Sequence, residues 1–394
     1  MVGGFVVVTL PQMLVAQGIP GDRAAICVAV IFSPVFWSFV LAPILDVRFR
    51  RRTYALVFGA TGIAAIAVTV VHHAVLGEVE TVMLFGFLSC CLFQSAVGGW
   101  AGSLIAKGHD SVLGAWSGMF SVGGSGVGVL ISGYAVQHFS RTAAAGIIFA
   151  AFLAPLVVFP VIPAPPPAKM LAITTFSRFG REVIALLKKR EVLVALAMFA
   201  LPSASFALTN VLGAWSDSFH AAPSLVSLIS GVGIILGSIT GCALVPPLAR
   251  RMALRPLYLS IGLVGAVFTL GLLLAPRGSA TFGLAFVGEN FFQSAAAATG
   301  LAIIFDVIGP GNPLAATTFA LLCAALTLPV DYMEFVDARG YHWDGITGAF
   351  LADALISGSA CALLAIVLRR RLFARLHARL KASAEPIERE FRSG

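Results

Sequence analysis

Charged residues are scarce in this chain: Asp, Glu, Lys and Arg make up 11% of its 394 residues, whereas apolar residues make up 59%. A soluble globular domain carries about 25% charged residues, so this composition excludes an ordinary water-soluble domain. The six Cys residues all fall within apolar runs, where Cys behaves as a small hydrophobic residue. The sequence therefore indicates neither a disulfide framework nor a metal site, and we expect no cofactor.

Groups that would support catalysis are also missing. The seven His residues lie at the ends of apolar runs or in the connectors between them. The sequence shows no Ser, His and Asp set, no cluster with metal-ligand spacing and no glycine-rich phosphate loop. We therefore do not expect an enzyme. A channel is disfavoured too, because the chain has no filter-like segment.

What the chain does contain is a series of long apolar runs. A helix needs about 20 mainly apolar residues to cross the hydrocarbon layer of a membrane. We predict twelve such spans, at residues 1–16, 24–45, 53–72, 81–105, 112–135, 142–163, 191–212, 222–247, 256–275, 281–305, 314–336 and 346–368. The first span has no charged segment before it, which argues against a cleavable signal peptide. The predicted fold class is an all-α polytopic membrane protein.

The positive charges indicate the orientation. None of the 26 Lys and Arg residues lies inside a predicted span, and 22 of them lie in alternate connectors or after the last span. Cytoplasmic loops are enriched in Lys and Arg, so we expect both termini and the central linker in the cytoplasm. The net charge of +8 then reflects topology and contact of the linker and tail with anionic lipids, with no nucleic-acid binding.

The chain repeats itself across two halves. We place six spans in residues 1–163 and six in 191–368, joined by a cytoplasmic linker at 164–190 with an amphipathic helix, and followed by a basic tail at 369–394. The Phe-Gln-Ser-Ala sequence at 93–96 recurs at 292–295, and the Arg pair at 51–52 recurs at 250–251, both at an offset of 199 residues. Two such halves form the major facilitator architecture.

Four short segments carry a closer resemblance. They are Ala42 to Asp46 with Arg50 to Arg52, Glu289-Asn290, Thr317 to Leu322, and Gly340 to Trp343. In these segments the chain resembles the AmpG-like muropeptide permeases and the related acetyl-CoA transporters. The resemblance implies uptake of an amphipathic, glycopeptide-like solute across a bacterial inner membrane by alternating access, and we expect proton coupling and a monomer.

The chain departs from that family at three charged positions, where it holds Ser38, Ser95 and Gly126. Their joint loss is physically consistent, because an unpaired buried charge is costly. With no Lys or Arg inside a span, a multiply charged anion is disfavoured as the solute. The alternatives are a siderophore or drug-like solute carrier of the same fold and, outside transport, a transport-dead sensor or scaffold.

Acidic residues within the spans are candidates for proton coupling, because burial away from water disfavours the charged form of a carboxyl. Glu289 is the first candidate, followed by Asp331 and Asp353. The competing interpretation of Glu289 is a solvated carboxylate near the outer end of its span. Asp331 and Glu334 share one helical face. Their alternative interpretation is that they mark the outer end of the helix, beside Asp337. For Asp353, the alternative is a position at the mouth of its span.

Neutral polar residues are candidates for solute binding. Gln94 and Gln293 lie near mid-membrane on equivalent helices, where an amide donates and accepts hydrogen bonds without carrying charge. Further candidates are Asn290, Asn210 and Trp100, the last as an apolar stacking face. A hydrogen bond between helices is the alternative role for the two glutamines.

Two sets of residues are candidates for gating. Asp46 with Arg50, Arg51 and Arg52 is predicted to latch the cytoplasmic side by ion pairing and helix capping. Retention of positive charge in the cytoplasm explains the three Arg residues alone but leaves Asp46 unexplained. Glycines of the fifth and eighth spans are predicted to line a contact between the halves that slides, or to pack statically: Gly124, Gly128, Gly233 and Gly237.

Overall fold

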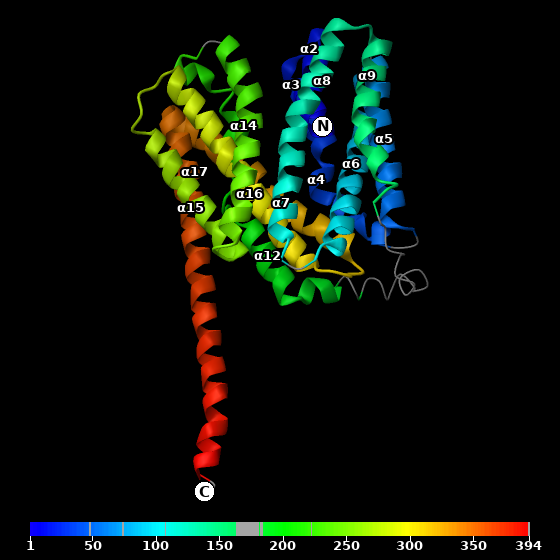
Figure 1. The fold of residues 1–394 in the computed structure, drawn as a ribbon. Helices are drawn as coiled ribbons and strands as arrows, with labels where there is room; N and C mark the ends of the chain where they lie inside the picture. The colour runs from blue at the N-terminus through cyan, green and yellow to red at the C-terminus, as the bar shows by residue number, and fades with distance from the viewer. Residues whose placement is uncertain are drawn as a thin grey trace.

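The computed structural model describes residues 1–46, 49–72, 75–106, 108–162, 181, 184–221 and 223–392. Helices form all of the regular structure in these ranges, which confirms the predicted all-α class. Most of the predicted linker lies outside the described residues. The tail is helical as far as Arg392 and continues straight away from the helix bundle (Figure 1).

Helices of the first half appear in blue to teal in Figure 1. They are α1 (Val2–Gly4), η1 (Phe5–Thr9), α2 (Leu10–Ala16), α3 (Gly21–Phe32), α4 (Pro34–Trp37), η2 (Ser38–Val40), η3 (Ala42–Asp46), α5 (Arg51–Val71), α6 (Leu76–Leu104), α7 (Asp110–Gly118), η4 (Met119–Gly123), α8 (Gly124–His138), α9 (Arg141–Leu153) and η5 (Ala154–Val158).

Helices of the second half appear in green to red. They are α12 (Arg190–Ala200), α13 (Leu208–Val211), η6 (Ser216–Phe219), α14 (Pro223–Ala249), α15 (Leu254–Leu272), α16 (Ser279–Ile308) and α17 (Ala315–Arg392).

The helices account for the predicted spans. Within the described ranges, eight helical segments are long and apolar enough to cross a membrane, and shorter apolar helices occupy Val2–Ala16 and Ile26–Val40. The last of the eight, Ala315–Leu368, contains two spans, because the backbone leaves helical geometry at Asp344 and Gly345. Gly345 has a φ of 55°, which glycine adopts at no steric cost.

The seventh span departs from the prediction of one helix over 191–212. Instead α12 ends at Ala200, and α13 begins only at Leu208. The cause is Pro202: a proline disfavours helical geometry in the residue before it, and Leu201 is extended, with φ −85° and ψ 153°.

Non-helical backbone at membrane depth needs other hydrogen-bond partners. The Tyr258 hydroxyl donates to the Ser203 carbonyl at 2.8 Å, and the Ser203 hydroxyl donates to the Met198 carbonyl at 2.7 Å. The break is therefore held by neighbouring side chains.

The two halves meet closely at one end of the bundle. Ala96 of α6 and Ala316 and Ala320 of α17 belong to one buried apolar cluster. A Cβ added to Gly99 of α6 would lie 2.5 Å from the Ala316 Cα, and one added to Gly114 of α7 would meet the Ala302 N at 2.7 Å. These contacts require small residues, because the backbones of crossing helices lie side by side.

The predicted glycine contact between the fifth and eighth spans is wrong in detail. Gly233 and Gly237 pack against α16, within their own half, whereas Gly128 packs against Met1. Gly124 has only the Met1 nitrogen nearby, at 3.8 Å. Other glycines of the fifth span do face the eighth span: an added Cβ would lie 3.0 Å from the Cys242 sulfur at Gly118 and 3.2 Å from Ile235 at Gly126.

Gly241 of α14 provides a test of this packing. A methyl group there would collide with the Phe291 carbonyl oxygen, so we expect Gly241→Ala to lower the free energy of unfolding by about 1–3 kcal/mol. Gly231→Ala is the matched control, since nothing lies within 4 Å of its added Cβ and alanine favours a helix. Thermal unfolding in detergent measures both, and equal midpoints would contradict the packing described.

Candidate functional site

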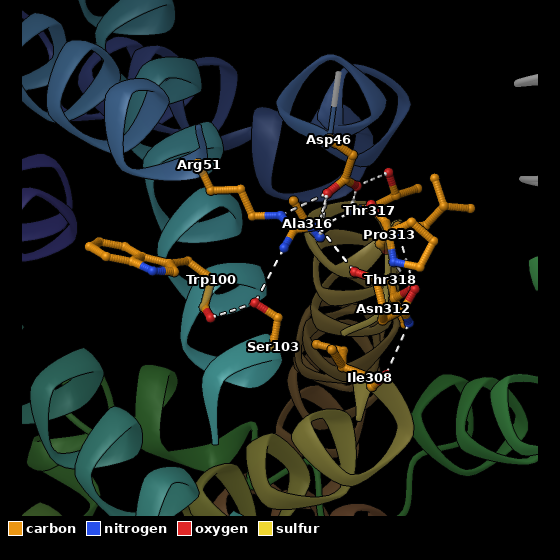
Figure 2. A network of polar contacts seen from close by, with 11 residues as sticks. Asp46, Arg51, Trp100, Ser103, Ile308, Asn312, Pro313, Ala316, Thr317 and Thr318 are labelled. Atoms are coloured by element: carbon orange, nitrogen blue, oxygen red, sulfur yellow. Dashed lines mark hydrogen bonds and ion pairs between the residues drawn. The ribbon is translucent and has the colours of Figure 1, made fainter. Parts of the chain in front are cut away.

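A buried carboxylate joins the two halves where they meet. Asp46, at the end of η3, is 5% exposed and accepts two hydrogen bonds from Arg51, at 3.0 and 2.8 Å. It also accepts the backbone N–H groups of Ala316 and Thr317, at 3.1 and 2.9 Å, and the Thr317 hydroxyl at 2.8 Å. The Asp46 carboxylate thus caps the N-terminus of α17 from the opposite half (Figure 2).

Arg51 extends the same contact. Its Nη2 donates to the carbonyls of Asn312 and Pro313, at 3.1 and 2.9 Å, and its Nη1 donates to the Ser103 hydroxyl at 3.3 Å. Burial raises the pKa of the Asp46 carboxyl, while the Arg51 guanidinium and the α17 donors oppose that rise. We call Asp46, Arg51 and the start of α17 the latch, and the end of the bundle that holds it the latch end.

The other two arginines do not join this contact. Arg52 donates to the carbonyls of Pro160 and Ile162 in its own half, at 2.9 and 3.5 Å. Arg50 is exposed and directly precedes α5.

Three carboxyls are buried together in the second half. Glu289 of α16 and Asp337 of α17 are 0% exposed, and Asp353, beyond the kink of α17, is 3% exposed. The three lie close enough to interact electrostatically. The Thr269 hydroxyl donates to Glu289 at 2.5 Å, but four of the six carboxyl oxygens are buried without a hydrogen-bond partner. We call these residues the carboxyl triad.

The structure of the triad corrects the sequence-based interpretation of three acidic residues. Glu289 and Asp353 are enclosed by protein, so a solvated rim position is wrong for both. Asp337, which the sequence interpretation left at the helix end, belongs inside, because the first segment of α17 continues past 336 to its kink at Asp344. The Asp-Gly pair at 344–345 is the sequence signal that places the turn there.

The candidates for solute binding lie in different surroundings. The Gln293 amide is partly buried and donates to the Thr209 hydroxyl at 2.8 Å. Asn290 is 3% exposed and donates to the Phe286 carbonyl of its own helix. Gln94, the counterpart of Gln293, is exposed on α6. The structure therefore does not bring the two glutamines into equivalent environments.

Two further candidates also differ. Trp100 is 3% exposed, and its ring lies perpendicular to that of Phe159, with centroids 5.8 Å apart, so the side chain is buried in this structure. Asn210 of α13 is exposed and donates to the Glu334 carboxylate at 2.6 Å. Asp331, one turn before Glu334, is half-buried and also lies close to it.

Three solved structures that share the fold are transporters or transporter homologues by their titles. The chain matches the E. coli fucose:proton symporter FucP (TM-score 0.69, 13% identity), covering 93% of this chain and 96% of that one. It matches the human organic anion transporter MFSD10 (0.64, 17%, covering 92% and 89%) and an outward-facing bacterial homologue of the iron transporter ferroportin (0.64, 17%, covering 94% and 95%). No family model and no curated protein matches the sequence.

These likenesses establish the class of fold. The chain has the major facilitator fold, all-α and polytopic, as the sequence predicts.

The latch leads to a test by hydrogen exchange. Asp46→Asn keeps the shape of the side chain but removes the charge that pairs with Arg51 and the helix N-terminus. We expect the amides of Ala316 and Thr317 to exchange at least fivefold faster, as measured by mass spectrometry on the purified protein. Glu78→Gln, an exposed carboxyl on α6, is the control. Unchanged exchange in Asp46→Asn would show that the cap does not hold this end closed.

Proposed function

We propose that the protein is a secondary active transporter of the major facilitator type, which couples uptake of an amphipathic organic solute to protons by alternating access. The observation that carries the proposal is the carboxyl triad. Three negative charges enclosed together would be very costly at membrane depth, and no Lys or Arg in the described ranges forms a salt bridge with them. The triad therefore requires bound cations, and protons satisfy carboxyl oxygens without a coordination shell.

The latch supplies the other requirement of alternating access, a contact that closes one end while the other end opens. Asp46 and Arg51 come from the first half, and the start of α17 comes from the second. By the positive-charge pattern the latch end is the cytoplasmic end, with both chain termini and the anionic lipids on that side. A rocking motion of the two halves must break the latch when the cytoplasmic side opens.

The class of solute follows from the candidate binding groups. Gln293 and Gln94 are neutral amides, and the predicted spans contain no Lys or Arg to pair with a multiply charged anion. A muropeptide-like solute, with sugar hydroxyls and amide groups, suits such a site and agrees with the resemblance of the sequence segments. The likeness to a sugar:proton symporter supports proton coupling at the level of the fold.

The test is uptake of labelled anhydromuropeptide into proteoliposomes, with and without an imposed proton gradient. We expect Glu289→Gln, Asp337→Asn and Asp353→Asn each to lower gradient-driven uptake at least tenfold. Counterflow, the exchange of solute without a gradient, should survive, because the triad carries protons and does not bind the solute. Glu78→Gln should behave as wild type.

Three other outcomes of the uptake experiment would contradict parts of the proposal. Equal loss of counterflow in the three variants would contradict a role limited to protons. Absence of uptake by folded wild-type protein would overturn the muropeptide substrate, and siderophore-like and drug-like solutes would be tested next. If none of them is transported, the sensor or scaffold alternative replaces transport.

A further inference from the structure

Two adjacent residues of the short helix α13 form hydrogen bonds with two different functional regions. Thr209 accepts the hydrogen bond of Gln293, the solute-binding candidate on α16, at 2.8 Å. The next residue, Asn210, donates to the carboxylate of Glu334 on α17, at 2.6 Å. A displacement of this single turn therefore alters both hydrogen bonds.

The backbone before α13 makes such a displacement feasible. Between Leu201 and Ala207 the chain is not helical, and Ala204 and Phe206 have positive φ values of 60° and 51°. Residues with a Cβ adopt this geometry at a cost, so the surrounding packing must impose it. Because no continuous helix joins α12 to α13, α13 can move without breaking a ladder of backbone hydrogen bonds.

The packing that imposes this geometry comes from the helices of the candidate site. The Phe206 ring stacks on Phe292 of α16, with centroids 5.9 Å apart and planes at 13°. The Ser205 hydroxyl meets the Ser357 hydroxyl, one turn after Asp353, at 3.4 Å. The break is therefore in contact with the neighbours of Gln293 and of the triad at once.

Glu334 lies on the exposed side of the triad. It is partly exposed, and it interacts electrostatically with Asp337, which lies three residues further along α17. Asp337 is fully buried, and neither of its carboxyl oxygens has a hydrogen-bond partner. The other charged groups near this path are Asp331 on the same helix and the remaining triad members, Glu289 and Asp353.

We propose that α13 couples solute binding to proton entry, with Glu334 as the entry group and Asn210 as the residue that controls it. This inference rests on the proposed proton-coupled transport. The Asn210 amide stabilises the anionic carboxylate of Glu334 while the solute site is empty. A polar group of the solute competes for the Gln293 amide, Thr209 loses its partner, and α13 shifts so that Asn210 leaves Glu334.

The proton then moves in three steps. A hydronium ion transfers its proton to the Glu334 carboxylate, which leaves a water molecule and a neutral carboxylic acid. Glu334 passes this proton to the Asp337 carboxylate and returns to its anionic form, ready for the next cycle. Asp337 exchanges it with Glu289 and Asp353, so one proton enters the triad for each release of Asn210.

The test measures proton flux without any solute. Purified protein in liposomes with an entrapped pH dye, with valinomycin and potassium setting the membrane potential, reports the passive proton leak. We expect Asn210→Ala to raise the leak about tenfold over wild type, because the entry group is freed permanently. Thr209→Val, which removes the acceptor for Gln293, should raise it in the same direction. The double variant Asn210→Ala with Glu334→Gln should return to the wild-type rate.

Gln137→Ala, the loss of an exposed amide on α8, is the matched control and should leak as wild type does. A wild-type leak in both folded single variants would overturn the proposal, as would a raised leak that persists in the double variant. These outcomes do not depend on the substrate. A raised leak abolished by Glu334→Gln, together with no solute uptake, would support the proton path and overturn only the proposed solute.

Discussion

Exclusion of uncompensated charge from hydrocarbon is the constraint that the rest of this structure obeys. It keeps Lys and Arg in the connectors. It also leaves Arg51 at the bundle end, where its guanidinium donates hydrogen bonds to the Asp46 carboxylate and to three other oxygens. The same constraint turns the carboxyl triad into a site, because carboxyls enclosed without a cationic partner must bind protons or other cations. It also explains why the broken seventh span is tied down by the hydroxyls of Tyr258 and Ser203.

The two halves share an arrangement of helices but carry different functional side chains. At the offset of 199 residues, Glu289 corresponds to Cys90. The fifth and sixth predicted spans, at 112–135 and 142–163, are the counterparts of the two spans of α17 and contain no acidic residue, so the triad has no duplicate. In the other direction Asp46 corresponds to Val245, so the second half has no matching cap. Leu10 stands at the position equivalent to Thr209, so the first half has no hydroxyl there to accept a hydrogen bond from Gln94. The first half thus supplies the charged side chains of the latch, and the second half supplies the carboxyl triad.

Hydropathy and positive charge act over whole spans, so they predict the fold, but the sequence predicts the site only in part. Asp46 stood out beside the Arg cluster, yet its partners Ala316 and Thr317 lie some 270 residues away, beyond any local pattern. The predicted span at 314–336 ends before Asp337, whereas the helix continues to its kink at Asp344, which places Asp337 inside the bundle. Pro202 was the available signal for the broken helix. Spacing along a helix predicts which glycines share a face, but it does not predict which neighbouring helix that face contacts.

The energy of the latch limits how the cycle can run. Asp46 accepts five hydrogen bonds, all with charged character, at about 1.5–3 kcal/mol each when water does not replace them. Opening admits water to this end, so the net cost falls to a fraction of that sum. Moving an equilibrium from one state to the other still takes about 5.5 kcal/mol of differential binding. Since Val245 provides no second latch, the open state needs another source of stability. Protonation of the triad removes the repulsion among its carboxylates, so it can supply this stability from the second half.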